Sequence, residues 1–162
     1  MAKKKTTAKK TAVKKAVVKK TVVKKTVVKK TTIKKAAVKK TVVKKKKTAL
    51  MASKKFAIEA AKIAIERNCK DVVVLDLVGK SPATDYFLIA TGTSDWQICS
   101  VADEIIEFGH KHKLRPFGKA GMEQGKWVLL DFVDVVIHLF SEEFRDYYDL
   151  ELLWGDAEKV KF

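Results

Sequence analysis

The sequence predicts an α/β (α+β) domain, with a mixed β-sheet flanked by helices, behind a disordered N-terminal tail. Three observations lead to this prediction. The charge of the chain changes sign near residue 50. Beyond that point helical and strand-like patterns alternate, which is typical of α/β and α+β folds. Near the C-terminus two strand-like runs lie close enough in sequence to form a hairpin.

The charge separates the chain into two parts. Of its 162 residues, 35 are Lys or Arg and 19 are Asp or Glu. Residues 1–50 hold 21 of the lysines and no acidic residue, which leaves 14 basic and 19 acidic residues, a net charge of −5, for residues 51–162. We therefore expect a basic tail over 1–50 and one domain over 51–162, long enough for a single core.

The tail repeats a five-residue unit, as in TVVKKTVVKK. A period of five matches neither a helix nor a strand, so no face collects the apolar residues, and we expect a free tail to be disordered. Its lysines can bind RNA or DNA phosphates without sequence preference, or act only as a solubilising extension. It is similar to the Lys-rich repeats of bacterial histone-like proteins and linker-histone tails. The lysines predicted to contact nucleic acid are Lys14, Lys15, Lys19, Lys20, Lys24, Lys25, Lys29 and Lys30.

The first part of the domain shows one helix and two strands. Ser53 can cap a helix, and Phe56, Ala60 and Ile63 then recur at helical spacing. The β-branched run 71–77 and the apolar run 85–91 predict buried strands, separated by the turn-forming sequence GKSPAT.

The second part begins with a helix that Ser94 and Gln97 open as an S-x-x-Q capping box. Its apolar face predicts an end near 109–113, and a short strand follows over 115–119. Runs 127–132 and 135–140 predict a hairpin. Ser141 is expected to cap a last helix from 142 to about 154.

Candidates for chemistry are scattered. Asp76 and Asp85 could hold a divalent cation, although they lie in different strands and suit strand-end turns equally well. The loop 91–94 could cradle a phosphate at a helix N-terminus, but a plain capped loop needs the same residues. Cys99 lies mid-helix, where Cys is usually a small buried hydrophobe, and His138 within an apolar strand is more often structural than catalytic. We expect no catalytic residue, metal or cofactor.

Two isolated cysteines, Cys69 and Cys99, fit neither a disulfide framework nor a metal-binding pattern. The longest apolar runs are too short to cross a bilayer. A cytoplasmic protein without a membrane segment is therefore expected.

Aromatic and acidic residues are concentrated toward the C-terminus. Such a composition is typical of protein–protein sites, while core packing must account for part of it. The residues are Trp127, Phe132, Tyr147, Tyr148, Trp154, Asp131, Asp134, Asp149 and Glu151.

The runs TDYFLIATGTSDWQICSVADEI, GKWVLLDFVDVVIHLF and FRDYYDLELLWGDA resemble the Iojap-like ribosomal silencing factor family over about residues 53–157. The resemblance implies a nucleotidyltransferase-like fold without the catalytic acids, and therefore a binding protein rather than an enzyme. It implies a translational repressor that binds the large ribosomal subunit through ribosomal protein number fourteen. Occupying that protein would block joining of the small subunit when nutrients are limiting.

The family's contact surface carries over to matching positions. These are Trp127, Asp131, Phe132, Asp134 and His138. The aromatic side chains would be anchors, and the aspartates would meet basic residues of the partner.

Two departures from the family pattern are evident. Val133 stands between the aspartates where the family commonly has Gly, and Val resists the positive φ that Gly allows. Ala120 stands where the family often has Glu, which removes one acidic contact.

Other functions are also compatible with the sequence. A nucleoid protein could use the tail to bind DNA and the domain as an adaptor. A nucleotidyl-transfer enzyme would bind nucleotide and metal. An acidic domain with exposed aromatic residues could also form a homodimer.

Overall fold

The computed structural model describes residues 48–162, which form one compact unit. Residues 48–50, which the sequence assigned to the tail, already belong to a helix. The remainder of the predicted tail, including its lysine pairs, lies outside the described residues.

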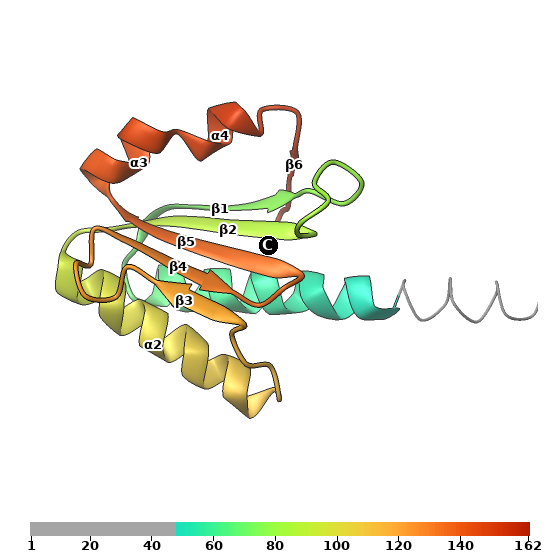
Figure 1. Ribbon diagram of the computed structural model, residues 1–162, viewed down its shortest axis with the longest axis horizontal. Coiled ribbons are helices and arrows are strands. Elements are labelled where there is room, and N and C mark those ends of the chain that lie inside the picture. Colours follow the sequence, from blue (N-terminus) through green and yellow to red (C-terminus); the bar gives the residue numbers. More distant parts are fainter. Residues whose placement is uncertain (1–47) are drawn as a thin grey trace, which may run out of the picture. The chain divides into compact units, whose positions relative to one another are not determined.

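A six-stranded sheet in the order β3-β4-β5-β2-β1-β6 forms the centre of this unit (Figure 1). The neighbours β2 and β5 are parallel and every other neighbouring pair is antiparallel, so the predicted mixed sheet is confirmed. The strands are β1 Lys70–Asp76, β2 Tyr86–Gly92, β3 Gly118–Ala120, β4 Trp127–Asp131, β5 Val135–Ser141 and β6 Glu158–Lys159.

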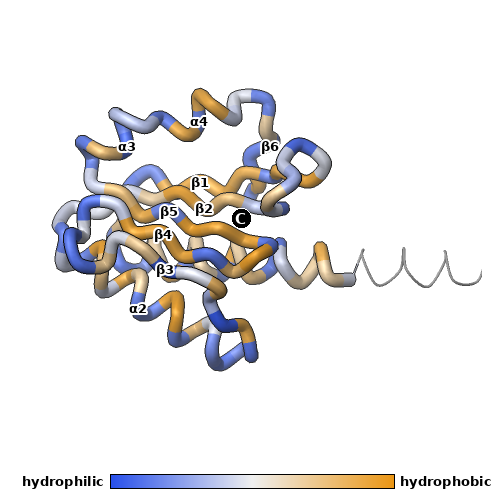
Figure 2. Tube along the Cα trace, viewed as in Figure 1, coloured by the Kyte–Doolittle hydropathy of each residue, from blue (hydrophilic) through white to orange (hydrophobic). Residues whose placement is uncertain are grey.

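Helices cover both faces of the sheet. In Figure 1 the N-terminal helix (residues 48–66) and α2 (Asp95–Lys111) lie on one side, and α3 (Glu142–Tyr148) and α4 (Leu150–Leu153) lie on the other. The main core fills the space beneath the first two helices, whereas a smaller cluster around Leu75, Ile89 and Phe140 lies beneath α3 and α4. Figure 2 shows the central strands as the most hydrophobic part of the trace.

Ser53 does not cap the N-terminal helix, because the helix includes residues 48–52. Its hydroxyl oxygen lies 3.1 Å from the carbonyl oxygen of Ala49 and 3.0 Å from Oδ2 of Asp134. Ser53 therefore joins this helix to the turn between β4 and β5.

The capping box at α2 forms in part. Ser94 Oγ accepts a hydrogen bond from the backbone N–H of Gln97 at 3.2 Å, as predicted. The Gln97 side chain does not return to Ser94. Its Oε1 accepts from the N–H of Thr93 at 2.6 Å, and its Nε2 donates to the carbonyl of Arg67 at 2.6 Å.

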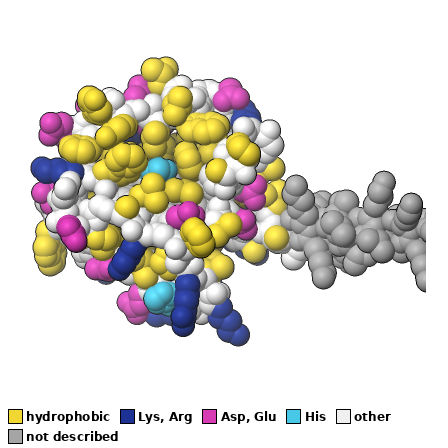
Figure 3. Space-filling view, viewed as in Figure 1, with side chains coloured by type: hydrophobic (Ala, Val, Ile, Leu, Met, Phe, Trp, Pro, Cys, Tyr) yellow, Lys and Arg dark blue, Asp and Glu magenta, His cyan; other side chains and the backbone are white. Residues whose placement is uncertain are grey.

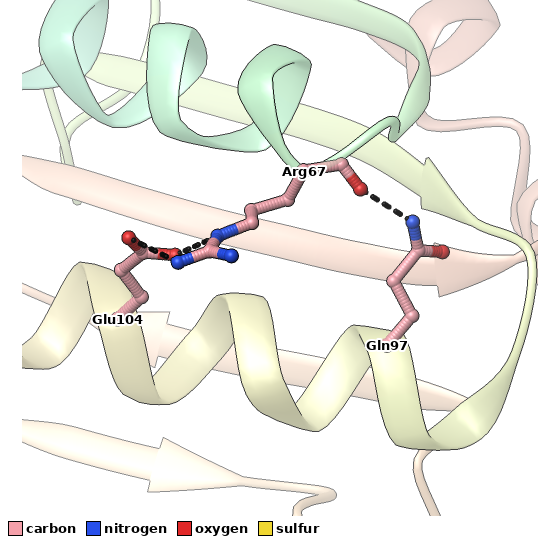
Figure 4. Close-up of polar contacts among 3 residues, drawn as sticks. All are labelled: Arg67, Gln97 and Glu104. Carbon is pink, nitrogen blue, oxygen red and sulfur yellow. Dashed lines mark hydrogen bonds and ion pairs between the residues drawn. The ribbon is translucent and has the colours of Figure 1, made fainter.

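Arg67 also reaches α2 through its side chain, with Nε donating to Glu104 Oε2 at 2.5 Å and Nη2 donating to Oε1 at 3.0 Å. Figure 4 shows these bonds together with the one from Gln97. The paired bonds are bidentate, which fixes orientation as well as distance. The end of the N-terminal helix is thus held against α2 at two points.

The last predicted helix is broken. Asp149 has φ 36°, so it ends α3, and its side chain accepts from the N–H of Leu152 at 3.2 Å to begin α4. Asp tolerates the left-handed region and is a favoured N-cap, which explains why the chain turns there. Ser141 precedes α3 without a capping hydrogen bond from its side chain.

The hairpin turn contains a strained residue. Val133 has φ 72°, and the N–H of Asp134 donates to the carbonyl of Phe132 at 3.0 Å, which closes a γ-turn in its positive-φ form. Oδ1 of Asp131 accepts from the N–H of Val133 at 2.7 Å and supports the turn. The backbone therefore keeps the conformation that Gly would favour, although a β-branched residue occupies the position.

We predict that Val133→Gly stabilises the protein by about 1 kcal/mol, because relief of the positive-φ strain exceeds the added entropy of the unfolded chain. Urea unfolding of the full chain measures this. Val136→Gly in β5 is the control. It should destabilise the protein, because the backbone there is extended and a glycine relieves no strain. A Val133→Gly protein less stable than the parent would show that the turn is not strained.

Candidate protein-docking surface

Strand alternation divides the hairpin between the two faces of the sheet. Val128 and Leu130 of β4 are buried in the main core, so the side chains between and beside them point to the face that carries α3 and α4. We call this surface the Trp127 face. It comprises Trp127, Leu129 and Asp131 of β4, Val136 and His138 of β5, Phe87 of β2 and Tyr148 of α3.

Trp127 is the centre of an aromatic cluster. Its ring lies 4.5 Å from the ring of Tyr148 and 5.2 Å from that of Phe140, measured between centroids. The indole remains half-buried, with one part of its surface open to solvent. These contacts hold the ring in place while part of it stays available to a partner.

His138 lies beneath this cluster with 5% of its surface exposed. Trp127 Nε1 donates to His138 Nδ1 at 3.3 Å, so the imidazole carries its hydrogen on Nε2. Within residues 48–162 that Nε2 has no hydrogen-bond partner. Burial lowers the pKa of His138 from 6.5 to about 4, and the ring is therefore neutral at neutral pH.

Phe132 lies on the opposite side of the sheet from Trp127. It is 8% exposed and its ring packs edge-on against Phe56 of the N-terminal helix at 4.8 Å. Side chains of an extended segment alternate between the two faces of the sheet, so Phe132 faces the core as Val128 and Leu130 do. Phe132 is therefore not an anchor on the Trp127 face.

The two predicted aspartates both have partners within the domain. Asp131, half-buried, supports the hairpin turn through Val133. The Asp134 carbonyl accepts from the N–H groups of Asp85 and Tyr86, both at 3.0 Å, and its carboxylate meets Ser53. Asp131 remains on the Trp127 face, whereas Asp134 connects the hairpin to β2 and to the N-terminal helix.

Beside the Trp127 face, α3 and α4 present apolar side chains to solvent. No residue of either helix is buried, and Tyr147 is 80% exposed. Arg145 anchors the pair to the sheet: its Nη2 donates to Glu151 at 2.5 Å and its Nη1 donates to Thr91 Oγ1 at 3.0 Å. The surrounding acidic residues are Glu142, Glu143, Asp146, Asp149, Glu151, Asp156 and Glu158. The surface is apolar with an acidic border (Figure 3).

The other candidates do not assemble a site. Gln97 occupies donors of the loop 91–94, the candidate phosphate site, since its Oε1 accepts from both the N–H and the hydroxyl of Thr93. Asp76 Oδ1 accepts from the N–H of Val78, in a turn. Among residues 48–162 there is no group of three or more metal-ligating side chains. Within the same residues no helix combines the length and the apolar character needed to cross a membrane.

Known proteins share this domain. The model of the family described as "Ribosomal silencing factor during starvation" matches residues 50–162. The chain belongs to this ribosomal silencing factor family. The resemblance predicted from sequence is confirmed, and the Lys-rich tail lies outside the match.

Individual relatives agree with the family model. Ribosomal silencing factor RsfS of Bacillus subtilis is 40% identical over 98 residues, covering 60% of this chain and 83% of that protein. The mouse protein "Mitochondrial assembly of ribosomal large subunit protein 1" is 33% identical over 92 residues, which cover 55% of this chain and 40% of the mouse protein. A crystal structure from Chromobacterium violaceum is 34% identical with a TM-score of 0.60, covering 70% of this chain and 91% of that chain.

The last comparison also bears on folding. A relative whose chain is covered to 91% has little besides this domain, and it forms an ordered crystal structure. Residues 48–162 likewise form one compact unit around a core of their own, as independently folding domains do.

Sequence reasoning missed part of the surface. Leu129, Val136 and Phe87 complete the Trp127 face, each half-buried. The two-residue side-chain period of β4 would have placed Leu129 on the same face of the sheet as Trp127. The same period would have placed Phe132 on the opposite face. Phe87 and Val136 depended on knowing that β2 and β5 pair in parallel, which no local pattern contains.

The low pKa of His138 predicts an acid-sensitive contribution to stability. Well above pH 6.5 the imidazole is neutral in both states, and the contribution is complete. As the pH falls toward 4 the unfolded chain binds a proton that the folded protein excludes, so stability decreases, by about 2 kcal/mol at pH 5. Urea unfolding of the full chain at pH 7.5 and pH 5 measures the difference.

His138→Gln should lack this component of the pH dependence, since Gln does not titrate. His112→Gln, at an exposed position, is the matched control and should behave as the parent does. An equal pH dependence for the parent and His138→Gln would contradict the prediction.

Proposed function

We propose that the domain is a translational repressor that docks on the large ribosomal subunit through the Trp127 face. Ribosomal protein number fourteen is the proposed contact, and occupying it would keep the small subunit from joining when nutrients are limiting. Membership of the silencing factor family and the mouse relative's name, which refers to the large subunit, support this choice. The protein then acts by steric exclusion and not as an enzyme.

The observation that carries this proposal is a half-buried Trp held rigidly within an exposed apolar surface. Trp and Tyr in such positions dominate binding energy in protein interfaces, because they lose little entropy and exclude water. A rigid Trp127, packed against Tyr148, fits the role of an anchor.

Charge and polarity fit a basic protein partner. The acidic residues of α3 and α4 border the Trp127 face, and ribosomal proteins that bind RNA are generally basic, so the two surfaces would attract each other. The His138 Nε2 hydrogen, which has no acceptor within residues 48–162, could donate to the partner if the surface rings shift on docking.

We predict that Trp127→Ala lowers the affinity for large subunits by at least about 30-fold, the effect of losing a central aromatic anchor. Co-sedimentation of the domain, residues 48–162, with separated large and small subunits measures it. Trp96→Ala is the matched control, because Trp96 is 82% exposed at the start of α2 and is not one of the residues of the Trp127 face.

Trp127→Phe separates loss of contact from loss of folding, since it keeps a ring in the cluster. If Trp127→Ala binds large subunits like the parent, the Trp127 face is not the docking surface. If the domain pellets equally with both subunits, the assignment to the large subunit fails.

The tail is proposed to add non-specific affinity for ribosomal RNA. Twenty-one lysines within residues 1–50 can displace counterions from phosphates, and a linked second contact raises overall affinity when both sites can be reached.

We predict that the affinity of the full chain for large subunits falls more steeply with salt than the affinity of residues 48–162. The slope of log affinity against log salt concentration should be steeper by about 0.7–0.9 for each lysine engaged. Binding assays between low and high salt measure both slopes. Equal slopes would exclude a contribution of the tail. Binding of the full chain to DNA as tightly as to ribosomes would favour the nucleoid function.

A further inference from the structure

A basic surface stands out within the otherwise acidic domain. Residues 108–122 contain four Lys or Arg side chains and no acidic residue, while residues 51–162 as a whole carry a net charge of −5. The segment leads from the end of α2 into β3 (Figure 1). We call it the basic edge. It consists of Lys111, Lys113, Arg115, Phe117 and Lys119.

The backbone of the basic edge presents its side chains in a defined order. Burial alternates from residue 115 to residue 119, with Arg115, Phe117 and Lys119 exposed and the two residues between them partly buried. The N–H of Phe117 donates to the carbonyl of Asp131, which extends the pairing of β3 with β4 beyond Gly118. In extended backbone, alternate side chains point the same way, so an aromatic ring lies between two cations.

Arg115, Phe117 and Lys119 have no role in the fold that would explain their presence at the surface. Phe117 and Trp96 are each 82% exposed, the largest exposed fraction among the large hydrophobic side chains of residues 48–162. Lys111 pairs with Glu107 on α2 and suits a helix C-terminus, whereas Arg115 and Lys119 have no ion pair within residues 48–162.

Figure 3 shows Lys and Arg side chains gathered at the lower margin of the view, toward the end of α2. Hydrophobic side chains dominate the upper part. Lys119 pairs with Leu130, a core residue beneath the helices, so the basic edge faces the α2 side of the sheet. It is therefore a surface distinct from the Trp127 face, on the other side of the same sheet edge.

We propose that the basic edge binds unpaired RNA, with Arg115 and Lys119 on successive phosphates and Phe117 stacked on a base. Cations alternating with an exposed aromatic ring are the combination that single-stranded nucleic acid sites use, since the charges follow the backbone and every base can stack. The choice of RNA over DNA rests on the proposed function, which places the domain on the ribosome. The tail cannot supply the stacking contact, because residues 1–50 contain no aromatic residue.

Fluorescence anisotropy of the domain, residues 48–162, with a labelled oligouridylate tests the proposal without the tail. Arg115→Glu combined with Lys119→Glu should reduce the affinity by at least about tenfold at low salt, and should lower the logarithmic salt slope by about 1.4 for two lost phosphate contacts. Phe117→Ala should reduce the affinity by about tenfold without changing the slope, since stacking releases no counterions.

The charge-matched control is Lys55→Glu combined with Lys161→Glu, two exposed lysines outside the basic edge. An equal loss in both double variants, or no loss with Phe117→Ala, would overturn the proposal in favour of general electrostatic attraction. Trp127→Ala should leave oligouridylate affinity unchanged, so failure of the proposed docking and failure of RNA binding are separate results.

A photo-cross-linking residue at position 117 of the full chain, bound to large subunits, distinguishes the partners. Cross-links to ribosomal RNA are expected. Cross-links to ribosomal protein alone would overturn the assignment. If the chain does not sediment with large subunits, the proposed function fails, while the oligouridylate result still decides whether the basic edge binds RNA.

Discussion

The structure depends on how the turn between β4 and β5 is held. The carbonyl of Asp134 accepts hydrogen bonds from two successive N–H groups, at Asp85 and Tyr86, immediately before β2 pairs with β5. The parallel register of the two central strands therefore begins at a point defined by the hairpin turn. Ser53 ties the N-terminal helix to the same aspartate. This turn thus connects the sheet, the hairpin and the N-terminal helix.

The register in turn decides which side chains meet on the surface. With β4 paired to β5 and β5 paired to β2, Trp127, His138 and Phe87 all point away from the main core. Their mutual contacts keep the exposed part of Trp127 in one orientation, which reduces the entropy lost on binding. The strain at Val133 is consistent with a turn that its surroundings hold in place, because positive φ at a β-branched residue persists only where the surrounding structure requires it.

Two surfaces of the domain differ in the sign of their charge. Acidic residues surround the apolar surface of α3 and α4, and the basic residues of the segment after α2 lie toward the other side of the sheet. A ribosome presents both basic proteins and phosphates, so a domain with two surfaces of opposite sign can be oriented by both. Electrostatic complementarity of this kind fixes orientation and speeds association more than it adds affinity.

Much of this protein could be read from its sequence, because the signals are local. Local patterns identified β1, β2, α2 and the hairpin of β4 and β5 but did not predict β6, and charge separated the tail from the domain. The family runs identified Trp127, Asp131 and His138, which the structure brings to one face. The tertiary structure decided what local patterns do not contain. Phe132 belongs to the core because of strand parity, Asp149 divides the last helix because it enters the left-handed region, and Phe87 joins Trp127 and His138 only through the parallel pairing of β2 and β5. Such contacts join residues far apart in sequence, and their energy depends on the register of the whole sheet.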